Sequence, residues 1–316
     1  MTERVLLGDV GGTNARFAAL NDGALGPIDH LRVAEYARFE DALAAYLKLQ
    51  DNPAIGGALF AVAGVVHGER CELTNNAWVV DAAALRARFG FADVRLINDF
   101  EAVAWSLPNL KSKDLRQLGG GKAEPHAPML AIGPGTGLGV AAYVPTGKTG
   151  RALISEGGHM TLPSGSVRED AIIAALRQSL GHVSAERILS GPGLERLYRT
   201  IATLDGAVVP DRPAREITKA GIEGSCAVSR AALDTFCAML GEVAGNFALV
   251  FGAQGGVFIG GGFVPRMRDY LPGTQLRARF DAKGRMSAYV EAIPVYLILH
   301  DDPAFIGLQS LAQRGA

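Results

Sequence analysis

A glycine-rich run near the N-terminus constrains this chain more than any other feature. It reads Gly8-Asp9-Val10-Gly11-Gly12-Thr13-Asn14 and lies between two apolar stretches, residues 5–7 and 17–20. Because glycine has no Cβ and tolerates positive φ, a tight turn between two strands can present backbone N–H groups to an anion, with Asp9 beside it to hold a metal ion. The run lacks the lysine of a Walker loop and the spacing of a dinucleotide fingerprint. It predicts a different phosphate-binding turn, with a plain hairpin turn as the alternative.

Two later glycine clusters strengthen this interpretation. Gly135-Thr136-Gly137 belongs to a run, residues 133–139, that again separates two apolar stretches, and residues 255–262 frame a short apolar strand with glycines. One such turn is weak evidence, but the ordered set of three is specific. It predicts two related lobes that clamp one nucleotide.

Composition excludes several classes of protein. A chain of 316 residues is long enough for two domains that share a cleft, and 48% hydrophobic with 20% charged residues is ordinary for a globular protein. The formal charge of -1 gives no electrostatic footprint for nucleic acid or an anionic membrane. We expect no apolar run as long as a membrane span and no signal peptide, and therefore a cytoplasmic protein. The cysteines, Cys71, Cys226 and Cys237, lack the spacing of a disulfide framework or a zinc site.

Strand-like and helical patterns alternate along the chain, which predicts an α/β architecture. We expect strands at 59–63 and 94–97, and helices at 81–89, capped by Asp81 and ended by Gly90, and at 98–107, ended by Pro108. The polar stretch 111–126 is expected to cross between lobes. The apolar run 231–251 is expected to be a core helix in which Gly241 and Gly245 allow the close approach of either another helix or a ligand. Residues 303–313 are expected to form an amphipathic helix that packs on the first lobe.

Asn98 and Asp99 stand where a strand passes into a helix, the place where open α/β sheets present side chains to a ligand. A carboxylate with a pKa of about 3.9 is ionised at neutral pH and can accept a proton from a hydroxyl. In phosphoryl transfer through a loose transition state, such a base chiefly orients the hydroxyl. The alternative is that the two residues only cap a helix.

A second group of polar residues lies in the middle of the chain. Glu156 and His159 flank two glycines in Ser155-Glu156-Gly157-Gly158-His159, and Glu186 follows a predicted cap at Ser184. A carboxylate and an imidazole can hold a metal, but no third ligand is close in sequence, and both groups suit the hydroxyls of a polyol. By itself, Glu186 is an ordinary first-turn glutamate.

Taken together, these motifs resemble the bacterial glucokinases of the hexokinase, Hsp70 and actin superfamily, in particular the group outside the ROK kinases that the enterobacterial enzyme represents. The similarity spans nearly the whole chain and rests on residues 8–16, 97–100, 135–140, 156–159, 181–187 and 256–259. It departs locally at Ser155, where the family often has glycine. The cysteine-rich zinc motif of the ROK kinases is missing from the sequence, so zinc is not implied.

The resemblance implies an ATP-dependent kinase that phosphorylates glucose at O6, with Mg²⁺ near Asp9 and Asp99 as the catalytic base. It implies that Asn98, Glu156, His159 and Glu186 hold glucose hydroxyls together with Asp99. The nucleotide would be bound by Gly8, Asp9, Val10, Gly11, Gly12, Thr13, Asn14, Gly135, Thr136 and Gly137. It also implies two actin-like (ribonuclease H-like) α/β lobes with a cleft between them, a small one at 1–109 plus 300–316 and a large one at 110–299, and a homodimer.

Other functions stay open from the sequence alone. A sugar-sensing regulator would bind the sugar without catalysis, although no helix-turn-helix or basic tail accompanies the lobes. An ATPase clamp of the actin or Hsp70 kind would not need Glu156, His159 and Glu186. Mannose or fructose could replace glucose, since the orientation of one hydroxyl is decided by small differences in placement.

Overall fold

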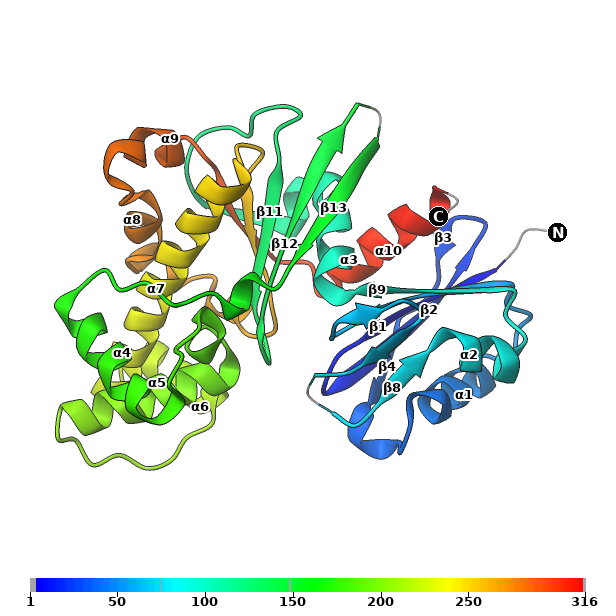
Figure 1. Cartoon of the computed structure of the whole chain (residues 1–316), viewed down its shortest axis with the longest axis horizontal. Coiled ribbons are helices and arrows are strands. Elements are labelled where there is room, and N and C mark those ends of the chain that lie inside the picture. The colour runs from blue at the N-terminus through cyan, green and yellow to red at the C-terminus, as the bar shows by residue number, and fades with distance from the viewer. Residues whose placement is uncertain (1–3, 75, 148, 315–316) are drawn as a thin grey trace. The chain divides into compact units, whose positions relative to one another are not determined.

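The protein is described by a computed structural model that covers residues 4–74, 76–147 and 149–314 (Figure 1). The chain divides into two compact units. Unit 1 consists of Met1–Leu110 with Asp301–Ala316, and unit 2 of Lys111–His300. The C-terminal segment therefore belongs to the same unit as the N-terminal glycine run.

The main sheet of unit 1 has the strand order β3-β2-β1-β5-β9, with β4 also paired to β2. The hairpin β1–β2 is antiparallel, whereas β1, β5 and β9 run parallel. These strands are β1 (Val5–Val10), β2 (Asn14–Asn21), β3 (Ala24–Leu25), β4 (Asp29–Arg32), β5 (Gly57–Val62) and β9 (Asp93–Asn98). A small antiparallel sheet adds β6 (Val66–His67), β7 (Arg70–Glu72) and β8 (Val79–Asp81).

The helices of unit 1 begin and end where local chemistry dictates. They are α1 (Phe39–Leu49), α2 (Ala82–Phe89), α3 (Asp99–Ser106) and α10 (Pro303–Gln313). The Asp81 side chain accepts a hydrogen bond from the Ala84 amide, and Gly90 ends α2 in the left-handed conformation. Helix α10 packs on α3 so closely that a Cβ on Gly307 would collide with the carbonyl oxygen of Ala102. The C-terminal helix therefore packs on the first unit, as predicted.

The main sheet of unit 2 repeats the arrangement of the first. Its order is β10-β15-β14-β11-β12-β13, in which β11–β12 is an antiparallel hairpin and β11, β14 and β15 are parallel. The strands are β10 (Leu115–Gly119), β11 (Met129–Pro134), β12 (Leu138–Thr146), β13 (Thr149–Ser155), β14 (Val257–Ile259) and β15 (Val295–Ile298). In each unit, two strands form a hairpin with a glycine-containing turn, and two further strands continue the sheet parallel to the first strand of that hairpin. This shared arrangement confirms the prediction of two related α/β lobes.

Unit 2 also contains most of the α-helical residues. Its helices are α4 (Val167–Leu180), α5 (Gly191–Leu204), α6 (Ala214–Glu223), α7 (Ala227–Phe251), α8 (Leu276–Asp281) and α9 (Ser287–Glu291). Helix α8 approaches α7 at two glycines, since a Cβ on Gly241 would meet the backbone of Leu276 and one on Gly245 that of Phe280. Both glycines thus allow close helix packing, one of the two roles expected for them.

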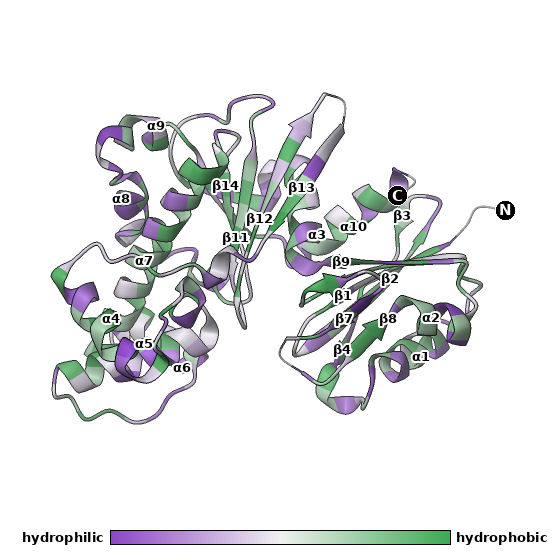
Figure 2. Ribbon diagram, viewed as in Figure 1, coloured by the Kyte–Doolittle hydropathy of each residue, from purple (hydrophilic) through white to green (hydrophobic). Residues whose placement is uncertain are grey.

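Helix α7 corrects one expectation from the sequence. Among the described residues, α7 alone is long and apolar enough, by length and composition, to cross a membrane. From the sequence, no apolar run of that length was expected. Of its apolar stretch, 67% is buried inside the protein. Apolar residues lie all round α7 because it is packed on several sides, as in the core helix of a large unit, and Figure 2 shows hydrophobic residues along it and along the strands of both sheets.

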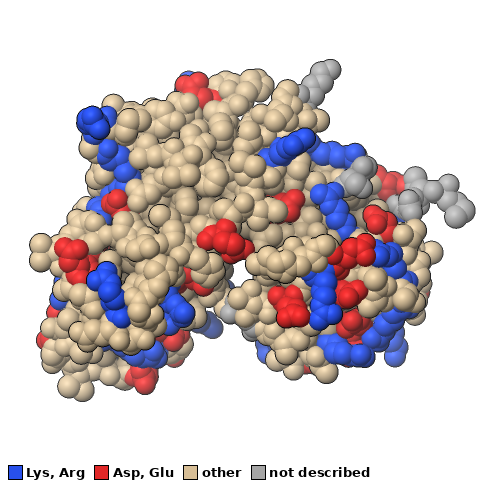
Figure 3. Space-filling view, in the orientation of Figure 1, with Lys and Arg blue, Asp and Glu red and all other residues tan. Residues whose placement is uncertain are grey.

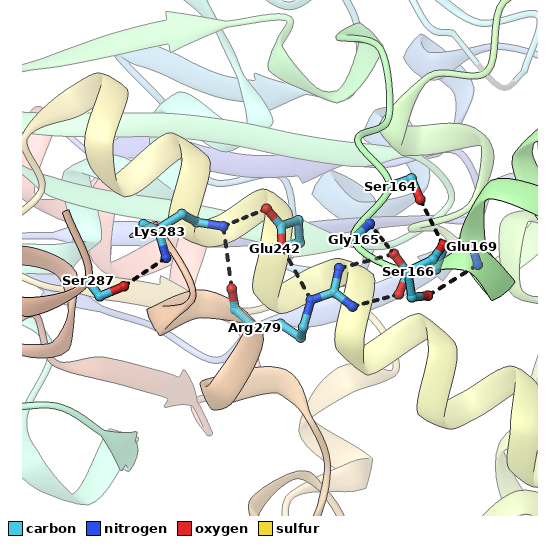
Figure 4. A network of polar contacts seen from close by, with 8 residues as sticks. All are labelled: Ser164, Gly165, Ser166, Glu169, Glu242, Arg279, Lys283 and Ser287. Atoms are coloured by element: carbon cyan, nitrogen blue, oxygen red, sulfur yellow. Dashed lines mark hydrogen bonds and ion pairs between the residues drawn. The ribbon is translucent and has the colours of Figure 1, made fainter. Parts of the chain in front are cut away.

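A buried ionic network joins three helices of unit 2 (Figure 4). The Arg279 guanidinium of α8 donates to both oxygens of Glu169 in α4, at 2.7 and 3.0 Å, and to Glu242 of α7 at 3.3 Å. The Lys283 ammonium donates to the other oxygen of Glu242 at 2.7 Å. The amide of Gly165 also donates to Glu169, which ties the loop before α4 to the network. Each buried charge therefore has a partner of opposite sign.

The expectation that residues 111–126 form a polar crossing between the lobes is wrong in part. Residues 115–119 form β10, which pairs with β15 in the register Leu115↔Ile298. The pairing partner lies far along the chain, so the short polar segment gave no local sign of a strand. Acidic and basic side chains are interspersed on the face drawn in Figure 3, and over the whole sequence they nearly balance, with a formal net charge of -1.

Candidate functional site

In unit 1, three parallel strands end at the same level of the sheet. Val10 of β1 is in register with Val62 of β5, and Val62 with Asn98 of β9. The glycine turn 11–13 follows β1, and α3 follows β9, so both motifs lie at the carboxyl edge of one sheet. This edge is where open α/β sheets place ligands.

The structure separates the first glycine motif into buried and accessible parts. Gly8 and Val10 are buried within β1, and a Cβ on Gly8 would lie 2.5 Å from the Cδ1 of Phe60. Gly8 is therefore required for packing of the core. Gly11 and Gly12 are half-buried, and Thr13 and Asn14 are exposed, with the Gly11 amide donating to the Asn14 carbonyl at 2.9 Å.

Asp9, predicted to be near the metal, is 9% exposed and accepts a hydrogen bond from the Arg16 guanidinium at 2.6 Å. Burial raises the pKa of this carboxyl, and the charge and hydrogen bond of Arg16 oppose the rise. Arg16 also lies 3.1 Å from the carboxylate of Asp302, at the start of α10. Among the described residues no group of three or more His, Cys, Asp or Glu is placed to hold a metal ion. A single carboxylate such as Asp9 can bind Mg²⁺ only together with waters or phosphate oxygens, which is how proteins commonly hold this ion.

Asn98 is the N-cap of α3, as the cap alternative predicted. Its Oδ1 accepts from the amides of Phe100 and Glu101, at 2.9 and 3.3 Å, and its Nδ2 donates to the Gly64 carbonyl at 3.2 Å. An amide nitrogen has two hydrogens, so one donor of Asn98 remains for a ligand. Asp99 is the first residue of α3, is half-buried, and its Oδ1 accepts from the Phe100 amide at 2.9 Å.

In unit 2, the second and third glycine clusters come together at the end of β11. The Gly135 amide donates to the Gly137 carbonyl, and the Gly191 amide at the start of α5 donates to the Gly135 carbonyl, both at 2.8 Å. Thr136 is exposed at the tip of the turn. Gly261, from the third cluster, has a φ of +96° and leaves no room for a Cβ beside Pro134. Glycine is therefore needed there for both the backbone conformation and the close approach.

The structure also brings the predicted sugar residues of unit 2 to this turn. The Glu186 carboxylate accepts a hydrogen bond from the Leu138 amide at 2.9 Å. The segments that carry His159 and Glu186 are joined by backbone hydrogen bonds, from Leu162 to Val183 at 3.0 Å and from Ala185 to Met160 at 2.9 Å. Glu186 is half-buried next to the turn, and no described residue donates a hydrogen bond to its other carboxylate oxygen.

Glu156 is the N-cap of the short 3-10 helix Gly157–His159, and His159 is its last residue. The distance between Oε2 of Glu156 and Nε2 of His159 is 3.8 Å. Their side chains are 60% and 59% exposed. Ser155, where the sequence departs from the family pattern, organises the turn: its hydroxyl donates to the Val140 carbonyl at 2.9 Å and accepts from the Gly157 amide at 3.2 Å. A serine at this position thus fixes the start of the loop that bears Glu156.

Several contributors escaped the motif analysis because they act through backbone atoms. They are the Leu138 amide, which holds Glu186, and the Gly64 carbonyl, which holds Asn98. Backbone donors and acceptors are present at every residue, so a sequence motif carries no sign of them. Arg16 lies within the similar region, and its partnership with Asp9 follows only from the pairing of β1 with β2.

Comparison with known proteins shows the family. A sequence model described as Glucokinase matches residues 6–315. The chain belongs to the glucokinase family. The curated glucokinase of Paramagnetospirillum magneticum is 46% identical over 98% of each chain, which confirms the resemblance noted from the motifs.

Solved structures agree with this assignment. The glucokinase from an Antarctic psychrotroph has a TM-score of 0.86 at 33% identity, with 99% of this chain and 100% of that chain covered. The glucokinase from Balamuthia mandrillaris in complex with glucose has a TM-score of 0.82 at 20% identity, with 99% and 94% covered, and so shares the fold. The predicted α/β fold class of these sugar kinases is therefore confirmed.

Proposed function

We propose that this protein transfers the γ-phosphoryl group of ATP to the 6-hydroxyl of D-glucose, which gives glucose 6-phosphate and ADP, the first step of glycolysis. The observation that carries the proposal is the match to the glucokinase family along residues 6–315. The geometry of the two units supports it, because each unit presents predicted ligand-binding residues at the ends of its strands.

Asp99 is the proposed base. At the first position of α3 the positive end of the helix favours an ionised carboxylate. The carboxylate aligns the 6-hydroxyl for attack and takes its proton as the bond to phosphorus forms, which contributes about 10² to 10⁴ in rate. Asn98, held by its cap and by Gly64, offers its remaining amide hydrogen to a neighbouring hydroxyl.

Glu156, His159 and Glu186 are the proposed partners of the other hydroxyls. A carboxylate accepts hydrogen bonds from hydroxyls, and a neutral imidazole can donate or accept, so the three residues match a polyol. The exposure of Glu156 and His159, about three fifths of each side chain, leaves them accessible to a sugar. We assign residues of both units to the same substrate, and we propose that the units are the small and large lobes of the enzyme.

ATP is proposed to bind with Mg²⁺ at the two glycine turns. In unit 1 the accessible residues are Gly11, Gly12, Thr13 and Asn14, and Asp9 is the carboxylate that would hold the ion. In unit 2 they are Gly135, Thr136 and Gly137. Mg²⁺ supplies charge neutralisation of the β- and γ-phosphates, while the backbone amides of the turns orient the phosphates.

We further propose that the enzyme is a cytoplasmic homodimer, on the strength of the resemblance to its family. Size-exclusion chromatography with light scattering tests the dimer. A mass of twice the chain's 33.1 kDa supports it, and a mass of one chain contradicts it.

The substrate is tested by ADP release from ATP and Mg²⁺ with glucose, mannose, fructose or no sugar, together with identification of the phosphorylated product. Turnover that requires glucose and yields glucose 6-phosphate is expected. Turnover without sugar would instead indicate an ATPase, preference for another hexose would reassign the substrate, and glucose binding without turnover would indicate a sensor.

A further inference from the structure

The peptide between Gly137 and Leu138 links the second glycine turn to the Glu186 carboxylate. The Leu138 amide donates to Oε2 of Glu186 at 2.9 Å. A Cβ on Gly137 would collide with the same oxygen and lie 3.1 Å from the carboxyl carbon. We propose that this peptide presets Glu186 for the sugar, so that Gly137 is a positioning residue for glucose as well as part of the nucleotide turn. This inference rests on the proposed function.

The backbone on both sides of the contact is fixed. The Ser190 hydroxyl donates to the Glu186 carbonyl at 2.8 Å, and the Gly191 amide donates to the Gly135 carbonyl at 2.8 Å. The segment of Glu186 therefore cannot shift easily to make room for a larger residue in the turn. The flexible end of the Glu186 side chain is the part that can move.

The hydrogen bond also selects how the carboxylate meets a ligand. A glutamate side chain has many rotamers, and immobilising one during binding costs free energy. The Leu138 amide selects one orientation before the sugar arrives and occupies Oε2, while the structure assigns no protein partner to Oε1 among the described residues. Preorganised in this way, Oε1 can accept a sugar hydroxyl without a further entropic cost.

Gly137→Ala tests this directly. The added methyl group displaces the carboxylate from the Leu138 amide, so we expect the dissociation constant for glucose, measured by calorimetry without nucleotide, to rise about 10- to 100-fold, the range for a lost hydrogen bond to a charged group. Gly135→Ala is the matched variant for this one readout, since its Cβ would meet nothing within 4 Å and neither glycine has a positive φ. Its glucose affinity should stay as in the wild type.

A double-mutant cycle with Glu186→Ala distinguishes displacement of the carboxylate from general damage to the turn. Once the carboxylate is removed, the methyl group has room, so Gly137→Ala should weaken glucose binding no further, and the double variant should match Glu186→Ala. If Gly137→Ala alone fails to fold, recovery of folding in the double variant gives the same support. Circular dichroism establishes the fold of each variant.

Two kinds of result would overturn the inference, and they differ in whether the sugar role of Glu186 falls as well. If Glu186→Ala weakens glucose binding but Gly137→Ala binds as Gly135→Ala does, or if the two effects are additive, the positioning role is refuted while the proposed kinase stands. If Glu186→Ala leaves glucose binding unchanged, the sugar role of Glu186 itself falls, and the positioning role with it. Gly273→Ala, an alanine in open space outside the site, serves as the control for unchanged turnover.

Discussion

Arg279→Met should destabilise unit 2 strongly, because it removes the partner of a buried carboxylate. The Glu169 side chain is 4% exposed, and Arg279 donates to both of its oxygens. Methionine retains much of the volume of arginine and none of its charge. The variant therefore leaves the Glu169 carboxyl buried and without a counter-charge, although the Gly165 amide still donates to it.

The expected magnitude follows from burial. Removing one partner of a buried ion pair costs about 3 to 5 kcal/mol, whereas a solvent-exposed pair contributes about 0 to 1 kcal/mol. For a unit of 150 to 250 residues each kcal/mol shifts the melting temperature by about 2 to 4 °C, so a fall of about 6 to 20 °C is expected. Lys283 remains paired with Glu242, so we expect the loss to come mainly from Glu169.

Arg168→Met is the matched control. Arg168 also donates to both oxygens of an aspartate, Asp205, but the two side chains are 44% and 43% exposed. Urea unfolding followed by circular dichroism measures both variants at pH 7. Because both tryptophans, Trp78 and Trp105, belong to unit 1, their fluorescence reports on the other unit in the same samples. Equal free energies of unfolding for the two variants would refute the argument from burial.

Three further predictions concern stability. Burial alone would raise the pKa of Glu169, but the hydrogen bonds from Arg279 and from the Gly165 amide outweigh it and lower the pKa below its ordinary value of 4.5. The stability that this carboxylate contributes is therefore complete above about pH 4.5 and is lost as the pH falls through the lower folded-state pKa. Between pH 7 and pH 3 the urea midpoint should fall less steeply in Glu169→Gln than in the wild type. Identical slopes for the two proteins would contradict this. Gly307→Ala overpacks α10 against the Ala102 carbonyl and should cost about 1 to 3 kcal/mol in thermal unfolding, whereas a wild-type melting temperature would contradict such close packing. Asp81→Ala removes the cap on the Ala84 amide and should cost about 1 kcal/mol, and an unchanged urea midpoint would show that the cap contributes nothing.

Local chemistry made part of the fold predictable. The cap at Asp81 and the stop at Gly90 defined α2, and the glycine turns marked hairpins in both units, because these signals act within a few residues. β10 was missed because its pairing with β15 joins segments distant in the chain. Helix α7 begins at Ala227, four residues before its expected start at Ala231, and its burial follows from packing that the sequence does not express.

The side chains proposed for the site could be selected from the sequence, and their roles remain predictions. Asn98 and Asp99 at a strand–helix junction, and Glu156, His159 and Glu186 near glycines, stood out from their residue types. The sequence could not tell that Gly8 serves the core, since this depends on Phe60 of the neighbouring strand. Nor could it reveal the bond from the Leu138 amide to Glu186, which joins residues brought together only by folding.

The central claim, that Asp99 is the base of a glucose kinase, is tested most directly by Asp99→Asn. Asparagine keeps the shape of the side chain and an oxygen to accept from the Phe100 amide, but it cannot take a proton. We predict that kcat falls by about 10²- to 10⁴-fold while the dissociation constant for glucose, measured by calorimetry, changes by less than about threefold. An undiminished kcat would contradict the account.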